Sequence, residues 1–172
     1  MEKGFYKYYK DLPPYAKGAL IVGGGFLLAL AGMKAYKSLF PSAEEKKSRE
    51  FVDNVKDEVD KYLKQGMKPT FADSQYNAFA NDIHEGMRYA VGDDYGNVQR
   101  ILLLMNNDID VAKLIKAFGV RQDYAFGVPT GSPKDLITFV NSELGDDYGG
   151  LTRYRVDAVN ANWKKKGIKY QF

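Results

Sequence analysis

Apolar residues recur at helical spacing through a strongly charged stretch between residues 42 and 65. Steps of three and four residues place them on one helix face, while lysine, glutamate and aspartate fill the opposite face. The stripe consists of Phe51, Val52, Val55, Val59, Tyr62 and Leu63. Ser42 followed by Glu45 is typical of a capping box, and Gly66 is typical of a helix end. We therefore expect an amphipathic helical connector over 42–66 that packs on the rest of the chain or on neighbouring subunits.

Five further stretches with helical periodicity follow, separated by turn residues. We expect helices over 74–90, 96–105, 109–118, 132–144 and 150–166. The fourth begins with Ser132 and Pro133, a cap followed by a proline in the first turn. Lys164, Lys165 and Lys166 complement the dipole at the end of the last helix. No run has strand character, so we predict an all-α chain with a helical domain over 67–172.

The apolar positions of these five helices define the predicted core. They are Tyr76, Phe79, Ala80, Ile83 and Met87 in the first helix, Val98, Ile101, Leu102 and Met105 in the second, Val111, Leu114, Ile115 and Phe118 in the third, Leu136, Ile137, Val140 and Leu144 in the fourth, and Leu151, Tyr154, Ala158, Ala161 and Trp163 in the fifth.

The N-terminal part has a different character, because residues 18–33 carry no charge and lie between Lys17 and Lys34. Sixteen residues of helix span roughly 24 Å, short of a bilayer core of about 30 Å. Snorkelling lysines and a continuation as far as Pro41 extend the span. We predict a transmembrane helix within a segment 1–41. Two other interpretations are a signal peptide cleaved near Ala29-Leu30-Ala31 and a buried soluble helix, which the glycines disfavour.

Residues of two kinds within this segment fit a membrane helix. Tyrosines and lysines suited to the headgroup region flank the apolar run: Tyr8, Tyr9, Lys10, Lys17, Lys34, Tyr36 and Lys37. Ala19 with Gly23 and Gly25 with Ala29 form small-xxx-small spacings that allow two helices to approach closely. We therefore expect a homo-oligomer. Lysines are numerous on both sides of the run, so the positive-inside rule assigns no orientation.

Composition excludes several classes of site. The chain has 172 residues, no cysteine and one histidine, which excludes disulfides, thiolate metal centres, a cysteine nucleophile and a multi-histidine site. The net charge of +3 arises in residues 1–41, which carry six lysines and two acids. The remainder carries 19 basic and 20 acidic residues, so we expect no sequence-specific nucleic-acid binding. No phosphate loop, dinucleotide turn or nucleophile elbow is present.

A series of short motifs resembles one annexin repeat. In order along the chain it comprises Ile83-x-x-x-Met87, Gly92-Asp93-Asp94, Val98-x-x-Ile101-Leu102, Ala117-Phe118-Gly119, Asp135-Leu136 and Ser142-Glu143-Leu144-Gly145. The resemblance covers about residues 72–166 and implies a five-helix fold, like the single-repeat annexin-like domains of bacteria and phages. The family's G-x-G-T turn is replaced by Gly-Asp-Asp-Tyr here, and the connection over 120–131 is longer. DLPPYAK before the apolar run also resembles membrane proteins of lipid-containing bacteriophages.

The resemblance implies a Ca²⁺ site in which Gly92 supplies a carbonyl and Glu143 a bidentate carboxylate. Asp93 and Asp94 add hard oxygen ligands of the kind that Ca²⁺ prefers. The pentapeptide Gly-Asp-Asp-Tyr-Gly occurs at 92–96 and again at 145–149. The simpler interpretation is that these acidic loops cap helix N-termini. We expect no other cofactor.

Two further groups of residues invite a functional interpretation. His84 and Glu85 are a potential acid–base pair, but Arg88 occupies the place of a second zinc-binding histidine, and neighbours on a helix do not face each other. We expect His84 to be a surface histidine or one satisfied by internal hydrogen bonds. The basic run 164–169 with Trp163, Tyr170 and Phe172 is suited to lipid headgroups or nucleic acid, and equally to the helix dipole.

These features predict a non-enzymatic, single-pass membrane protein with a structural or adaptor role and no catalytic residues. Its expected partners are the lipid bilayer and protein, either neighbouring subunits or a capsid. The phage resemblance implies a virion membrane protein that links an internal membrane to the capsid. Two alternatives stay open: a Ca²⁺-dependent phospholipid-binding module, and a membrane-anchored cell-wall hydrolase that uses Glu85 or Glu143.

Overall fold

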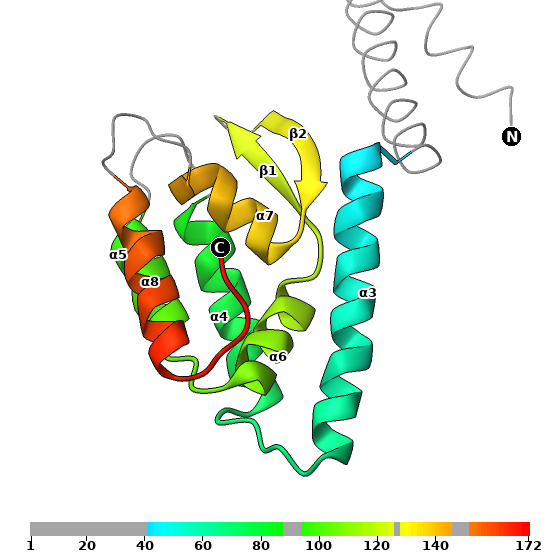
Figure 1. Cartoon of the computed structure of the whole chain (residues 1–172). Helices are drawn as coiled ribbons and strands as arrows, with labels where there is room; N and C mark the ends of the chain where they lie inside the picture. The colour runs from blue at the N-terminus through cyan, green and yellow to red at the C-terminus, as the bar shows by residue number, and fades with distance from the viewer. Residues whose placement is uncertain (1–40, 88–93, 126–127, 146–151) are drawn as a thin grey trace, which may run out of the picture. The chain divides into compact units, whose positions relative to one another are not determined.

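The computed structural model of the chain describes residues 41–87, 94–125, 128–145 and 152–172 (Figure 1). Contacts divide the chain into two compact units, Met1–Ser42 and Ala43–Phe172. The described helices of the second unit are α3 (Ala43–Lys64), α4 (Asp73–Gly86), α5 (Tyr95–Leu103), α6 (Asp108–Phe118), α7 (Leu136–Val140) and α8 (Arg153–Lys165). A π-helical turn, η1 (Asn141–Gly145), follows α7, and strands β1 (Arg121–Ala125) and β2 (Val128–Lys134) form a hairpin. The described part is therefore mostly helical, as predicted.

The amphipathic helix predicted over 42–66 is confirmed as α3. Val52, Val55 and Val59 are buried, whereas Leu63 is 46% exposed and does not join the core. Gly66 has a φ of +80° and ends the helix in a Schellman arrangement. Its N–H donates to the Leu63 carbonyl, and the next N–H donates to the Tyr62 carbonyl. Because α3 packs on α6 and β2, this helix lies within the same compact unit as residues 67–172.

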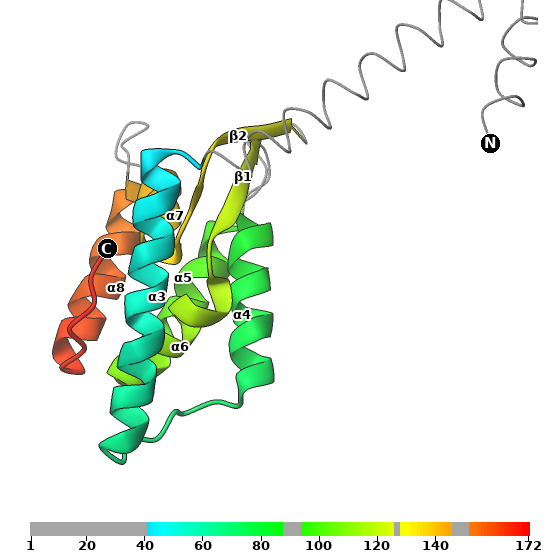
Figure 2. The same cartoon turned by 90° about the vertical axis from the view of Figure 1, so that its right-hand side faces the viewer.

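Helix α6 occupies the centre of the helical layer, in contact with α3 on one side and α4 on the other (Figure 2). Its residues Ile109, Val111, Leu114 and Ile115 are fully buried. Helices α4 and α5 pack together, and α8 lies beside α5 (Figure 1). The predicted core positions of α4, α5 and α6 are confirmed as buried or, for Phe79, as packed against the core.

The prediction that no strand is present is wrong. β1 and β2 pair antiparallel, with Arg121 opposite Lys134 and Asp123 opposite Thr130, and the register shifts between these two pairs. β2 contains two prolines and a glycine at +58° φ, a composition that argues against a strand in a larger sheet. A two-stranded hairpin has free edges, where a missing N–H is tolerated. The Gln122 amide adds a side-chain bond of 2.6 Å to the Thr130 carbonyl.

The fourth predicted helix begins later than expected. Ser132 and Pro133 belong to β2, and the N-cap is Asp135, whose carboxylate accepts from the Thr138 N–H. The helix is α-helical only as far as Val140 and continues as η1 to Gly145. The Ser-Pro signal is therefore overridden by the pairing of β2 with β1 and by the stronger cap three residues later.

The face of the last helix was predicted incorrectly. α8 buries Val156, Val159 and Trp163, while Tyr154 is 54% exposed. Ala158 and Ala161 are exposed as well, and Leu151 lies outside the described residues. The predicted positions and the buried positions both have helical spacing. The buried positions carry two valines and a tryptophan, which bury more apolar surface than the two alanines of the predicted set. Trp163 alone was placed correctly.

The predicted membrane segment lies outside the described residues, and so do all of its anchor and small-residue positions. Those positions are Tyr8, Tyr9, Lys10, Lys17, Ala19, Gly23, Gly25, Ala29, Lys34, Tyr36 and Lys37. Within residues 41–172 as described, none of the helices has both the length and the hydropathy needed to cross a bilayer.

Candidate functional site

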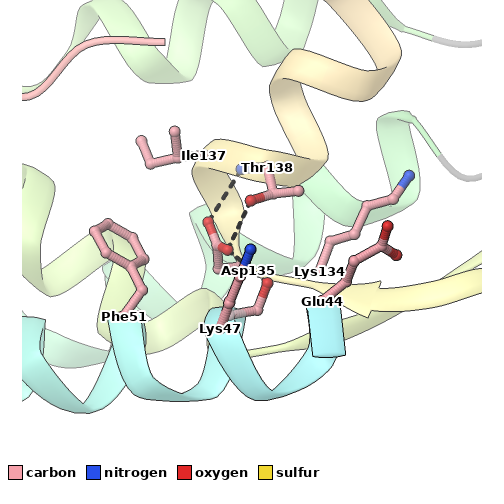
Figure 3. A pocket seen from close by; sticks show the side chains of 8 residues that line it. Glu44, Lys47, Phe51, Lys134, Asp135, Ile137 and Thr138 are labelled. Carbon is pink, nitrogen blue, oxygen red and sulfur yellow. Dashed lines mark hydrogen bonds between the residues drawn. The ribbon is translucent and has the colours of Figure 1, made fainter. Parts of the chain in front are cut away.

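A groove of about 420 Å³ runs between the first turns of α3 and the start of α7 (Figure 3). α3 contributes Glu44, Lys47, Ser48 and Phe51 to its lining, and the segment after β2 contributes Lys134, Asp135, Ile137 and Thr138. Phe51 and Ile137 lie at one end of the groove and Glu44 with Lys134 at the other, with Asp135 between them (Figure 3). The groove therefore combines an apolar end, a charged end and a buried acid.

Asp135 forms the base of this groove and is 3% exposed. One carboxylate oxygen, Oδ2, accepts from the Ser48 hydroxyl at 2.7 Å and from the Thr138 hydroxyl at 2.8 Å. The other oxygen, Oδ1, accepts from the Thr138 N–H at 3.0 Å. Three donors thus satisfy the carboxylate, which caps α7 and ties it to α3.

The charged residues of the groove differ in whether they form hydrogen bonds within the fold. The Lys134 ammonium donates to the Ser142 hydroxyl at 2.8 Å and to an Asp123 carboxylate oxygen at 3.3 Å, so it joins β2 to η1 and β1. Glu44 and Lys47 are exposed and, among the described residues, neither forms a hydrogen bond or an ion pair. The charges that face solvent at this groove are therefore one acid and one base on the same helix.

A second buried acid, Asp110, holds the segment between α3 and α4 against α6. It accepts from the Thr70 N–H at 2.7 Å, the Thr70 hydroxyl at 2.6 Å, the Tyr76 hydroxyl at 2.6 Å and the Asn106 N–H at 3.0 Å. Burial and the bond to this carboxylate raise the pKa of Tyr76 above its ordinary value of 10.0. The phenol therefore stays protonated as the donor, which suits a structural role.

The C-terminal segment forms a third polar cluster, on the later turns of α3. The Tyr170 hydroxyl donates to Glu58 at 2.5 Å, and the Lys169 ammonium lies 3.2 Å from the other oxygen of that carboxylate. Burial alone raises the pKa of Glu58, but these two hydrogen bonds together with the positive charges of Lys169 and Lys61 outweigh it and hold the pKa below 4.5. Asn160 on α8 pairs with both backbone groups of Phe172. The tail therefore links α8 to α3.

The residues predicted to bind Ca²⁺ are only partly placed by the structure. Gly92 and Asp93 lie outside the described residues. Asp94 is the N-cap of α5, and its carboxylate accepts from the Asn97 N–H at 3.0 Å. This is the helix-capping role that the sequence suggested as the simpler interpretation of the acidic loop. Glu143 lies in η1. No three acidic or histidine side chains gather at one point within the described ranges, and Ca²⁺ binding stays a prediction.

His84 was expected either on the surface or satisfied by internal hydrogen bonds, and the structure shows the second. Its Nε2–H donates to the Gln122 carbonyl at 2.9 Å, and its ring packs against Phe118 and Phe139. Nδ1 lies 3.9 Å from a Glu85 carboxylate oxygen, beyond hydrogen-bond distance. This histidine therefore joins α4 to the hairpin.

The basic run 164–169, which begins in the last turn of α8, also has a structural role. The Lys166 ammonium donates to the Leu103 and Met105 carbonyls at 2.9 and 2.7 Å, so it satisfies the free end of α5. Trp163 is fully buried, its indole N–H donates to the Leu102 carbonyl at 2.9 Å, and its ring contacts Phe172. Trp163 is therefore not available to stack on a base or to enter a headgroup layer.

Sequence reasoning missed the groove, because its two sides come from segments that are far apart in the sequence. Ser48 and Asp135 are 87 residues apart in the chain. The one local signal is Asp135 followed three residues later by Thr138, the spacing of a helix cap. The Ser132-Pro133 pair just before it led to a predicted helix start that is too early.

No protein-family model matches this chain, and comparisons with curated proteins and with solved structures found no match either. The annexin and phage resemblances therefore rest on the quoted residues alone.

Proposed function

We propose that this chain is a non-enzymatic, single-pass membrane protein in which residues 1–41 anchor a helical adaptor unit to a bilayer. The adaptor unit comprises the connector helix α3 and the helical domain that follows it. Its partner is a protein layer next to the membrane. The phage resemblance makes that layer a capsid and the bilayer an internal virion membrane.

The observation that carries this proposal is the uncharged run 18–33, which ends ten residues before a well-packed helical unit begins at Ala43. Tyrosines and lysines on both sides of the run match the two interfaces of a bilayer. A chain that combines one such run with a compact polar-surfaced unit is suited to hold that unit at a membrane surface.

The use of the buried acids supports a structural role over the hydrolase alternative. Glycoside hydrolysis needs a pair of carboxyl groups that face a cleft. Asp110 and Asp135, the two buried aspartates among the described residues, each accept three or more hydrogen bonds from neighbouring segments of the fold. The Glu85 side chain is 55% exposed on α4. These two buried aspartates thus stabilise a helix start and the segments packed against α6.

Alkaline carbonate extraction of membranes tests the anchor directly. We expect the full chain to stay in the membrane pellet and the Phe26→Lys variant to be released in part, because a lysine at a helix centre costs about 2.5–3.5 kcal/mol of insertion. Asp57→Lys, an exposed change on α3, is the matched control and stays in the pellet. Release of the unaltered chain by carbonate contradicts the proposal.

The location of the protein tests the virion assignment separately. Gradient-purified particles should contain the chain together with lipid and shell proteins. Its presence in host membranes alone would leave an anchored adaptor but remove the capsid as its partner.

A further inference from the structure

We propose that the α5–α8 seam, the line along which these two helices lie side by side, binds single-stranded nucleic acid without regard to its sequence (Figure 1). This inference goes beyond the proposed adaptor role. It uses described residues of the folded unit and does not depend on the predicted membrane anchor.

Positive charge is concentrated on the two helices that form this seam. α5 carries Arg100 and no acid, and α8 carries four basic residues and one acid, Asp157. Residues 42–172 as a whole carry 19 basic and 20 acidic residues, so the part outside these two helices carries 14 basic and 19 acidic residues. The folded unit therefore has a basic face although its net charge is close to zero.

Four cations lie along the seam, and none of them forms an ion pair with a carboxylate among the described residues: Arg100, Arg155, Lys165 and Lys166. Arg155 donates to the side-chain amide oxygen of Gln99 at 2.8 Å, and Arg100 donates to that of Asn97 at 2.7 Å. The Lys166 ammonium donates to carbonyl and amide oxygens. Lys165 is exposed. Because the acceptors are neutral, the positive charges are left uncompensated.

The spacing of these cations fits a chain of repeated anions. Arg155 and Lys166 lie eleven residues apart, close to three turns, so they share one side of α8 and are separated by roughly 16 Å along its axis. Tyr154 and Lys165 have the same spacing on the adjacent, outward stripe, with the small exposed Ala158 between them. A strand laid along the seam therefore meets a cation at each end and an alanine between them.

Tyr154 distinguishes nucleic acid from other anionic partners. It is 54% exposed, and the Arg155 guanidinium lies over its ring, 5.0 Å from the ring centre. Unpaired bases stack on such rings whatever their identity, and arginine adds a cation–π contribution. An acidic peptide would use the charges but not the ring. A headgroup layer favours helices that expose leucine, phenylalanine or tryptophan, whereas α8 buries its valines and its tryptophan.

Fluorescence anisotropy of a short labelled oligothymidylate tests the proposal, with the full chain in nanodiscs of zwitterionic phosphatidylcholine. We expect the logarithm of the affinity to fall linearly with the logarithm of the salt concentration, with a slope of about −0.7 per phosphate neutralised. Lys165→Gln and Arg100→Gln should each reduce the magnitude of this slope by about 0.7.

Lys64→Gln is the matched control for these charge changes. Like Lys165, Lys64 is exposed in the last turn of a helix and has no partner within the described ranges, but it lies on α3. We expect its salt slope to equal that of the unaltered chain. Absence of binding at low salt overturns the proposal, and so does a change in Lys64→Gln as large as that in Lys165→Gln.

Replacement of Tyr154 tests base stacking separately from charge. Tyr154→Leu keeps an apolar side chain but removes the ring, so we expect affinity to fall about ten-fold. Tyr154→Phe keeps the ring and should bind as the unaltered chain does. Tyr154 lies outside the core, and the fluorescence of the buried Trp163 verifies that both variants are folded. Equal affinities of the leucine and phenylalanine variants overturn the stacking role.

Competition distinguishes the anionic partners. Unlabelled oligothymidylate should displace the probe at a lower concentration of negative charge than polyglutamate or vesicles of phosphatidylglycerol do. Displacement by either of these at an equal or lower charge concentration overturns nucleic acid as the partner.

The outcomes also separate this inference from the proposed function. A chain that carbonate releases from membranes, and that binds oligothymidylate in free solution, refutes the anchor and supports the seam. A chain that stays in the pellet and binds no oligothymidylate keeps the anchor and refutes only the seam.

Discussion

Replacing Asp110 with asparagine tests whether the buried acids stabilise the fold as charged acceptors. Asp110 is fully buried, and each of its oxygens accepts one backbone N–H and one hydroxyl. Oδ1 receives the Thr70 N–H and the Tyr76 hydroxyl, and Oδ2 receives the Thr70 hydroxyl and the Asn106 N–H. The two hydroxyls can turn to accept from an amide, but a backbone N–H cannot.

The expected loss follows from this geometry. Whichever way the introduced side-chain amide is oriented, its NH₂ faces one of the two backbone N–H groups, so that group loses its acceptor. A donor left unsatisfied costs about 1–3 kcal/mol, and the bond that remains is weakened by the loss of the charge. We expect Asp110→Asn to lower the free energy of unfolding by about 2–4 kcal/mol, a large share of the roughly 5–15 kcal/mol of a typical domain.

The assay uses Trp163, the single tryptophan of the chain, which is fully buried. Urea unfolding of the full chain in detergent micelles is followed by Trp163 fluorescence. Tyr76→Phe removes one of the four bonds together with its donor. It also removes the acceptor of the Phe71 N–H, so it should cost about 1–2 kcal/mol. Asp57→Asn on the exposed face of α3 should stay within about 0.5 kcal/mol of the unaltered chain. An Asp110→Asn variant as stable as the Asp57→Asn control would refute the reasoning.

Two further measurements follow from the polar clusters. The pKa of Glu58 lies below its ordinary value of 4.5 in the folded state, so its stabilisation is present above pH 4.5 and is lost as the pH falls through the lowered value. Tyr170→Phe, which removes a hydrogen bond to this carboxylate, should therefore destabilise the chain more at pH 7 than at pH 3; an equal loss at both values would contradict the assignment. Calorimetric titration with Ca²⁺ should give no binding heat, because Asp94 serves as a helix cap; a binding heat that disappears in Glu143→Gln would favour the calcium-dependent lipid-binding alternative.

Much of the helical framework is readable in the sequence, because the helices bury a continuous apolar stripe. The prediction succeeded for α3 to α6, where three- and four-residue spacings of valine, leucine and isoleucine leave one choice of face. In α8 the same reasoning met two overlapping stripes and selected the one with Tyr154 and two alanines. The true face includes Val156 and Val159, which only the volume available beside α5 identifies.

Local sequence patterns do not predict the hairpin or the groove, because contacts with distant parts of the chain stabilise both. β1 is polar and β2 is interrupted by prolines, so neither has the alternation of a half-buried strand. Their pairing is supported from outside, through the contact of β2 with α3 and the bond from His84 to the Gln122 carbonyl. The groove exists only once α7 lies beside α3, and the single cue to it, Asp135 with Thr138, is a common capping pattern.

The attachments along α3 bear on the proposed adaptor role. α3 is the element that continues the chain from the predicted anchor, and the rest of the unit holds it at three separate levels. Ser48 bonds to Asp135 near its start, valines pack on α6 in its middle, and Glu58 bonds to Tyr170 in its later turns. A load applied at Ala43 therefore passes to α7, to the core and, through the tail, to α8. A helix held at only one level would pivot under the same load, so this spacing suits a unit that must keep a fixed orientation at a membrane.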